Sequence, residues 1–257
     1  MFGGQANINE TGFTYADYAR RGFFELVGVA VLSLGLYAGL SAITRRETPA
    51  ARRAFTLLSA GLIALVLAIL SSAWMRLILY EEAYGLTRLR ASTHVFIPWL
   101  ALLLFTVALL ELFGRRGALG FALLVFVVGF TVTLPVVNMD AWIARTNLAR
   151  AMEGKDLDGN TLVGLSIDAY PVLAGAYQDP ASPENIRQQT GAALTCWQME
   201  GRGADRFDWR SWVINERTYG QQLKGLDLSA FIQSRVDGSQ DVIVNGQVFT
   251  CFPYGFD

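Results

Sequence analysis

Charged and aromatic side chains of the kinds that bind ions or headgroups, or that transfer protons, gather in three segments of this 257-residue chain. The segments are TYADYARRGFFEL, RLILYEEAYGLTRLR and NMDAWIARTNLAR. The candidate site residues in them form a polar cluster of both signs: Tyr18, Arg21, Glu25, Arg76, Glu81, Glu82, Tyr84, Arg88, Asp140 and Arg145. We interpret the cluster first as a structural clamp between helix ends, second as a site for a ligand, ion or lipid headgroup, and third as a catalytic site.

Two members of the cluster, Glu25 and Arg76, lie about one helical turn inside long apolar runs. An unpaired charge at such a depth costs up to roughly 3 kcal/mol unless the side chain reaches the headgroups or finds a partner. Arg21 precedes Glu25 by four residues, and Arg76 lies at a similar depth on another run. We therefore expect a pair or a triad among these three side chains.

The familiar catalytic templates are missing from the sequence. It contains one histidine, His94, and no CxxC, phosphate-binding glycine loop or GxSxG, which excludes His-rich metal sites and the common hydrolase motifs. The segment KDLDGN has its glycine at the wrong position for a calcium loop, so a helix-linking turn is the better interpretation. The sequence identifies no cofactor, and its acidic and basic residues are too evenly matched to indicate a nucleic-acid partner.

The elements that must position the cluster are four apolar runs. The chain is 53% hydrophobic and 17% charged, against roughly 45–50% and 25% in soluble proteins. A bilayer core of about 30 Å needs about 20 apolar helical residues, and the runs that satisfy this are 22–43, 54–79, 93–113 and 117–137. In an antiparallel arrangement of four spans, the three polar segments meet at one membrane face.

The two halves of the chain differ in charge. Before Asn138 there are 11 basic and 7 acidic residues, and from there on 10 basic and 15 acidic. The basic residues near the span ends divide evenly between the two faces, so they do not fix the orientation. Both cysteines, Cys196 and Cys251, lie in the acidic half, which predicts a disulfide in an oxidising compartment, with two unrelated buried thiols as the alternative. We therefore place the N-terminus and tail outside the cytoplasm.

The tail is predicted to consist of short helices and one hairpin. Helices are expected over 139–152, over 161–176 with a break at Pro171, after an N-cap at Ser182, and in FDWRSWVINERTYGQQL and LSAFIQ. Asn245 and Gly246 separate two β-prone runs, the signature of a tight hairpin. A Cys196–Cys251 bond would join that hairpin to the third tail helix.

Small residues and one acidic residue within the spans suggest packing roles. Gly28, Gly35 and Gly39 form a small-residue face, which we interpret as internal packing of the four helices, with homodimerisation as the alternative. Glu111 precedes Arg115 by four residues, so a solvated pair near the cytoplasmic edge is expected.

The segments TYADYARRGFFELV, EEAYGLTRLR and VNMDAWIARTNLARAMEGKDLD resemble signature stretches of an uncharacterised bacterial multi-pass membrane family, domain of unknown function 4173, akin to the sister group 4153. The resemblance covers roughly Phe2 to Leu173. It implies a topology and a bacterial plasma-membrane location, but no activity. Because members of the family carry further hydrophobic helices upstream, it also implies that this chain is a C-terminal portion or a shortened form.

These patterns predict an all-α membrane protein, with a four-helix transmembrane domain (1–137) and a mainly α extracytoplasmic tail (138–257) that ends in a β-hairpin. The expected function is that of a scaffold, sensor or accessory subunit, in contact with the lipid bilayer and other membrane subunits, and without catalytic machinery. The alternative is a transporter or channel fragment that uses the polar cluster and a kink between His94 and Pro98.

Overall fold

The computed structural model describes residues 15–45, 47–202, 214–236, 239–244 and 247–251. The chain divides into two compact units. The bundle unit comprises Met1–Tyr80 and Thr93–Thr133, and the tail unit comprises Glu81–Ser92 and Leu134–Asp257. The connection between the second and third apolar helices therefore belongs to the same unit as the tail.

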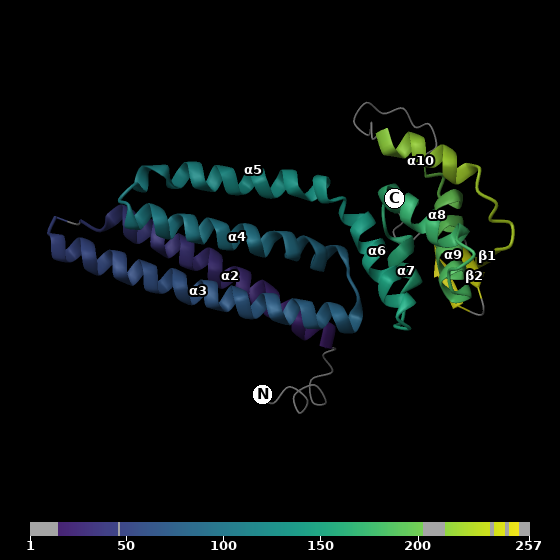
Figure 1. Cartoon of the computed structure of the whole chain (residues 1–257), viewed down its shortest axis with the longest axis horizontal. Coiled ribbons are helices and arrows are strands. Elements are labelled where there is room, and N and C mark those ends of the chain that lie inside the picture. The colour runs from purple at the N-terminus through teal and green to yellow at the C-terminus, as the bar shows by residue number, and fades with distance from the viewer. Residues whose placement is uncertain (1–14, 46, 203–213, 237–238, 245–246, 252–257) are drawn as a thin grey trace. The chain divides into compact units, whose positions relative to one another are not determined.

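The bundle unit is built from helices α2 (Tyr15–Ile43), α3 (Pro49–Tyr84), α4 (Arg88–Leu112) and α5 (Leu119–Val137), which lie side by side in Figure 1. Three of them, α3, α4 and α5, are long and apolar enough to cross a membrane. The described apolar part of α2 is shorter, Gly28–Ile43. These lengths and compositions indicate a membrane location.

Helix α3 is longer than the apolar run that predicts it. It has 36 residues, so it continues by more than a turn beyond the run at each end. The added turns carry Arg52 and Arg53 at one end and Glu81 and Glu82 at the other. A helix satisfies its own backbone hydrogen bonds, so it can extend through the interface while charged side chains reach water.

The core of the bundle is mainly aliphatic and is formed by stripes on α2, α3 and α4. Its buried members repeat at helical spacing: Ala30 and Tyr37 on α2, Ile63, Val66 and Leu70 on α3, and Ile97, Leu100, Leu103, Leu104 and Val107 on α4. Large apolar side chains also face outward, as Leu57, Leu65 and Phe105 do. Such exposure is expected where hydrocarbon is the solvent.

The tail unit contains α6 (Met139–Met152), α7 (Gly159–Val163), the short 3₁₀ turn η2 (Ile167–Ala169), α8 (Tyr170–Gln178), α9 (Glu184–Met199) and α10 (Ile214–Lys224). A second 3₁₀ turn, η1 (Arg116–Ala118), precedes α5 in the bundle unit. Strands β1 (Ile232–Val236), β2 (Ser239–Val244) and β3 (Gln247–Thr250) form an antiparallel sheet in the order β1-β2-β3. The predicted hairpin is β2–β3, with Val242 opposite Phe249.

The core of the tail unit surrounds α9. Trp197 is fully buried, and its indole N–H donates to the carbonyl of Val163 at 2.9 Å. The predicted disulfide is present, because Cys196 and Cys251 are bonded and both fully buried. It joins α9 to the residue that follows β3.

Two predictions for the tail are wrong in detail. LSAFIQ is not helical: its first part is a turn, and Ile232 begins β1, because pairing with β2 decides its conformation. Ser182 is buried and does not cap α9, whose N-cap position falls on Pro183. The break near Pro171 is confirmed, since this residue lies in the first turn of α8. Helix α10 forms over the described part of its predicted run, while 203–213 lie outside the described residues.

Candidate functional site

The centre of the polar cluster is an ion pair between the start of α4 and the start of α6. The guanidinium of Arg88 binds the carboxylate of Asp140 through two bonds, from Nε to Oδ1 at 2.8 Å and from Nη2 to Oδ2 at 2.6 Å. The backbone N–H of Ser166 also donates to Asp140 Oδ2, at 2.8 Å. Asp140 therefore joins three segments of the tail unit.

A second set of bonds holds the loop before α4 against α6. The side-chain amide of Asn147 accepts from the backbone N–H of Leu86 at 2.7 Å and donates to the carbonyl of the same residue at 2.8 Å. Arg150 donates to the carbonyl of Glu82 at 3.0 Å. Glycine is required at position 85, between Glu82 and Leu86 in the chain, because its φ is +78° and a Cβ there would lie 2.6 Å from Arg150 Nη1.

We call the set Glu82, Gly85, Leu86, Arg88, Asp140, Asn147, Arg150 and Ser166 the loop clamp. The side chains of Leu86, a member of the clamp, and of Ala91 on α4 are fully buried, and they belong to the same core as Ile143 and Ala144 of α6. The connection between α3 and α4 is thus part of the folded core of the tail unit, as well as a link between two apolar helices.

The electrostatics of the clamp favour the charged form of Asp140. Burial alone raises the pKa of this carboxyl group, but the hydrogen bonds from Arg88 and Ser166 outweigh it, so the pKa of Asp140 lies below its usual value. The side chain of Asp140 is 11% exposed, whereas that of Arg88 is 58% exposed. The anion is therefore buried and its cation remains partly in water.

The other predicted cluster residues are distributed more widely. Glu81 is half-buried at the end of α3, and Tyr84 and Arg145 are exposed. Arg76 is exposed on α3, within the bundle unit. The side chains of Tyr18, Arg21 and Glu25 lie outside the described residues, although their backbone belongs to α2. The predicted Glu25–Arg76 pair therefore stays a prediction.

Glu111 occupies a different place from the one predicted. It is 3% exposed inside the bundle unit, and its carboxylate accepts hydrogen bonds from Tyr37 at 2.9 Å and Thr56 at 3.1 Å. The expected solvated pair with Arg115 is wrong, because α4 ends at Leu112 and Gly114 takes a φ of +68°. Position 115 therefore does not lie one turn above Glu111 on the same helix.

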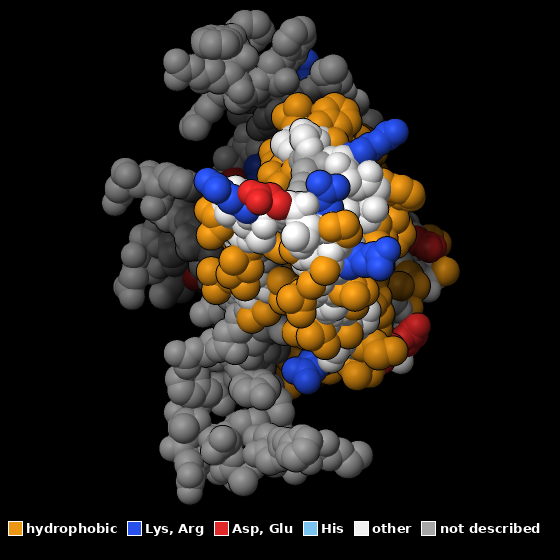
Figure 2. Space-filling model, turned by 90° about the vertical axis from the view of Figure 1, so that its left-hand side faces the viewer, with side chains coloured by type: hydrophobic (Ala, Val, Ile, Leu, Met, Phe, Trp, Pro, Cys, Tyr) orange, Lys and Arg blue, Asp and Glu red, His pale blue; other side chains and the backbone are white. Residues whose placement is uncertain are grey.

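The end of the bundle unit near Glu111 is basic. The connections from α2 to α3 and from α4 to α5 both lie there and expose Arg45 and Arg115, and the start of α3 exposes Arg52 and Arg53. The described part of this end also exposes one acid, Glu47. Figure 2 shows the blue side chains spread over this end of the molecule. The other ends of the apolar helices also carry arginines, among them Arg76 and Arg88, so the distribution of basic residues does not fix the orientation.

The histidine and the KDLDGN aspartate considered as ligands in the sequence have packing and capping contacts in the structure. Among them, no group of three or more His, Cys, Asp or Glu side chains is placed to hold a metal ion. The ring of His94 packs edge-on against Trp74, with the ring centroids 4.8 Å apart. Asp158 caps α7 by accepting from the N–H of Asn160, as expected for a helix-linking turn.

The glycine face on α2 does not pack inside the described part of the bundle. A Cβ at Gly28, Gly35 or Gly39 would meet nothing within 4 Å, and Gly35 and Gly39 are exposed. The interpretation as internal packing finds no support there. Homodimerisation through this face stays the alternative prediction.

Sequence reasoning missed Asn147 and Ser166. Asn147 shares a helical face with Asp140, Ala144 and Ala151, all of them buried, so a polar residue within an apolar stripe was the available signal. Ser166 contacts Asp140 through both its backbone N–H and its side chain, and it lies 26 positions further along the chain in a connecting segment that shows no helical or strand periodicity.

Comparison with known proteins supplies a family and no function. No curated protein and no solved structure matches the chain. The family model for domain of unknown function 4153 (DUF4153) matches residues 1–176, close to the range of the resemblance drawn from the sequence. The match is to the group named there as a sister, and membership of 4173 is not shown. Because the match covers more than half of the chain, this protein belongs to the DUF4153 family.

Proposed function

We propose that this protein is a non-catalytic scaffold or accessory subunit of a membrane complex, in which the helical bundle anchors the tail unit as an extracytoplasmic interaction domain. The loop clamp is the observation that carries the proposal. A loop that merely joined two spans would not need to bury Leu86 and Ala91 completely in a second unit. Here the tail unit is connected to the apolar helices at three points along the chain, after Tyr80, before Thr93 and after Thr133.

The chemistry of the clamp favours a structural role. The carboxylate of Asp140 is bonded to a guanidinium and a backbone N–H, and the amide of Asn147 is bonded to a single backbone unit. Polar groups bonded in this way hold elements together and have little capacity left for a substrate. The core of the bundle is mainly aliphatic, and its buried acid, Glu111, is hydrogen-bonded to Tyr37 and Thr56; these features likewise support an anchor more than a polar pathway.

The buried disulfide supports the proposed orientation. A disulfide in the tail unit suits an oxidising compartment, whereas the basic residues near the span ends divide evenly between the two faces and do not distinguish them. In intact cells, a thiol reagent that cannot cross membranes should label a cysteine placed at Val248 and leave one at Thr48 unlabelled, in a background without other free thiols. If only the cysteine placed at Thr48 is labelled, the orientation is the opposite of the one proposed.

Site-specific photo-crosslinking in the native membrane tests the scaffold proposal. The probe replaces Val248, a side chain 49% exposed on the edge strand β3, and the control probe replaces Leu65, which is 67% exposed on α3. We expect one discrete adduct with another protein from Val248, and adducts with lipid from Leu65. The proposal fails if Val248 gives no protein adduct while the purified chain carries ions across vesicle membranes, the result expected of a transporter.

A further inference from the structure

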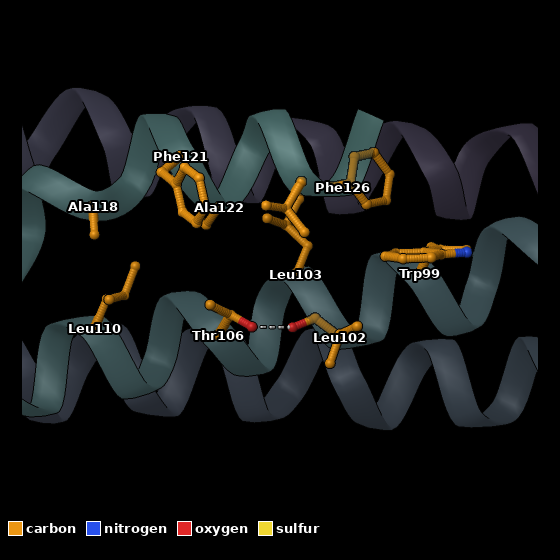
Figure 3. A pocket seen from close by; sticks show the side chains of 10 residues that line it. Trp99, Leu102, Leu103, Thr106, Leu110, Ala118, Phe121, Ala122 and Phe126 are labelled. Carbon is orange, nitrogen blue, oxygen red and sulfur yellow. Dashed lines mark hydrogen bonds between the residues drawn. The ribbon is translucent and has the colours of Figure 1, made fainter. Parts of the chain in front are cut away.

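A groove runs between α4 and α5 on the bundle unit. Its volume is about 220 Å³, and its lining is almost entirely apolar. Figure 3 shows Leu110 and Ala118 at one end of the groove and Trp99 and Phe126 at the other. Helix α5 itself contributes no fully buried side chain, so the groove lies where the outermost helix of the bundle is least closely packed.

One end of the groove is closed by a tight helix contact. The indole of Trp99 fills the space above Gly129, where a Cβ would lie 2.1 Å from a ring carbon. Its N–H donates to the hydroxyl of Thr133 at 3.2 Å. Toward the other end, the small side chains of Ala122 and Ala118 leave room between the helices. The result is a slot with a closed aromatic end.

The walls of the slot offer no free polar group for an ordinary polar ligand. The hydroxyl of Thr106 donates to the carbonyl of Leu102 at 2.8 Å on its own helix, as Figure 3 shows. From Trp99 to Leu110 the slot follows α4 for eleven residues, about 16 Å at the usual helical rise. That is about one leaflet of a 30 Å hydrocarbon core, and the slot follows the direction that acyl chains take.

The open end of the slot is positively charged. Arg115 is held between the two residues that form this end, because its N–H donates to Leu110 at 2.8 Å and its carbonyl accepts from Ala118 at 3.2 Å. Its side chain is exposed, as are Arg45, Arg52 and Arg53 at the same end of the bundle. Basic side chains at the mouth of an apolar slot between membrane helices match an anionic phospholipid headgroup.

We propose that the α4–α5 groove is a binding site for one anionic phospholipid of the surrounding membrane, with an acyl chain in the slot up to Trp99 and the phosphate against Arg115. The occupant is a membrane lipid rather than a free anion, because the apolar slot and the cation adjoin one another and only a lipid uses both. The site does not depend on the scaffold proposal.

The unmodified chain gives the first test. The protein, purified in mild detergent, is titrated with phosphatidylglycerol or phosphatidylcholine whose acyl chains carry bromine, which quenches nearby indole fluorescence. The signal of Trp99 is the difference between the wild type and Trp99→Phe. We expect quenching of this component to saturate at one lipid per chain and to require about fivefold less phosphatidylglycerol than phosphatidylcholine, the effect of one basic side chain near the headgroup.

Matched variants separate the slot from its mouth. Ala122→Trp fills the slot and should weaken retention of phosphatidylglycerol in native mass spectra by more than about tenfold, since excluding two or three methylene groups has that effect. Leu124→Trp adds the same ring at a position 58% exposed and outside the groove, and should leave retention unchanged. Arg115→Gln should abolish the headgroup preference, whereas Arg145→Gln, at an exposed position of α6 in the tail unit, should keep it.

Three results would overturn the assignment. Equal binding of the two lipids by the wild type would remove the headgroup site. Retention unaffected by a folded Ala122→Trp variant would remove the slot. A change from dimer to monomer in Ala122→Trp, with lipid retention unaltered, would show that a helix of a second copy fills the groove. If Ala122→Trp fails to fold, the quenching of Trp99 in the wild type still decides the question.

Discussion

Replacing Arg88 and replacing Asp140 should lower the free energy of unfolding of the tail unit by different amounts. Arg88→Met keeps most of the aliphatic stem but leaves a carboxylate that is only 11% exposed without its cation. Removing one partner of a fully buried pair costs roughly 3–5 kcal/mol. Because Arg88 is itself 58% exposed and the pair is partly screened, we expect about 2–3 kcal/mol of lost unfolding free energy for the tail unit.

The opposite change should cost less. Asp140→Ala leaves a guanidinium that can return to water, and one backbone N–H, that of Ser166, without its acceptor. An unsatisfied buried donor costs about 1–3 kcal/mol, so we expect a value in the lower half of that range. In the double variant the charge penalty disappears, and a coupling energy of about 1–2 kcal/mol should appear in the double-mutant cycle.

Urea unfolding of the full chain in mild detergent provides the measurement. The indole of Trp197, fully buried in the tail unit, reports the transition by its fluorescence. Arg145→Met is the control, because this arginine is exposed on α6, the helix that carries Asp140. Its loss should change the free energy of unfolding by less than about 0.5 kcal/mol. Additivity of the two single variants within about 0.3 kcal/mol, or a larger cost for Asp140→Ala than for Arg88→Met, would refute the reasoning.

Three further predictions concern pH, the disulfide and the buried acid of the bundle. Because folding lowers the pKa of Asp140, its ionised carboxylate stabilises the tail unit at neutral pH, and this stabilisation should be lost as the pH falls below about 4. Unfolding measured as a function of pH should show the loss in the wild type and not in Asp140→Asn. Replacing Cys196 and Cys251 by serine, which opens a link across 55 positions, should lower the unfolding free energy of the tail unit by roughly 4 kcal/mol in the chain-entropy estimate; an unchanged urea midpoint would contradict it. Glu111→Leu should lower the thermal midpoint of the bundle unit by leaving the hydroxyl of Tyr37 without its acceptor, at a cost of about 1–3 kcal/mol, and a variant as stable as wild type in differential scanning calorimetry would show that the buried carboxylate is dispensable.

Features that depend on local pattern were predictable from the sequence. Helix α6 has the bounds of the amphipathic run that predicts it, and the three long apolar helices contain most of the expected spans. The β2–β3 hairpin follows from Asn245 and Gly246, and the disulfide follows from the position of two cysteines in one acidic half. The helices follow from hydrophobic periodicity and the hairpin from its turn residues, which are signals carried by neighbouring residues. The disulfide follows from the compartment expected for a single pair of cysteines.

Features that depend on distant partners were not predictable in the same way. LSAFIQ has no strong local preference, and β1 forms because β2 offers a strand with which to pair. Glu111 satisfies the i, i+4 pattern with Arg115, but a helix end and a left-handed glycine intervene, and hydroxyls from two other helices replace the arginine. The type of a residue determines which kinds of hydrogen bond it can form, whereas the tertiary structure determines which residue is placed close enough to form them.

Two buried carboxylates, Asp140 and Glu111, bear on the choice between a structural role and an active site for the polar cluster. Asp140 and Glu111 are both buried, and each accepts hydrogen bonds from two other segments of its own unit. A buried charge in a protein must be compensated wherever it lies, and the cheapest compensation is a set of groups fixed by the fold. Such a set holds its elements in one arrangement, since moving any one of them exposes an uncompensated charge. A catalytic or transport carboxylate must instead keep part of its bonding capacity for a substrate or ion. By that criterion the bonds of Asp140 support our proposal that the loop clamp has a structural role and holds the α3–α4 connection in the tail unit.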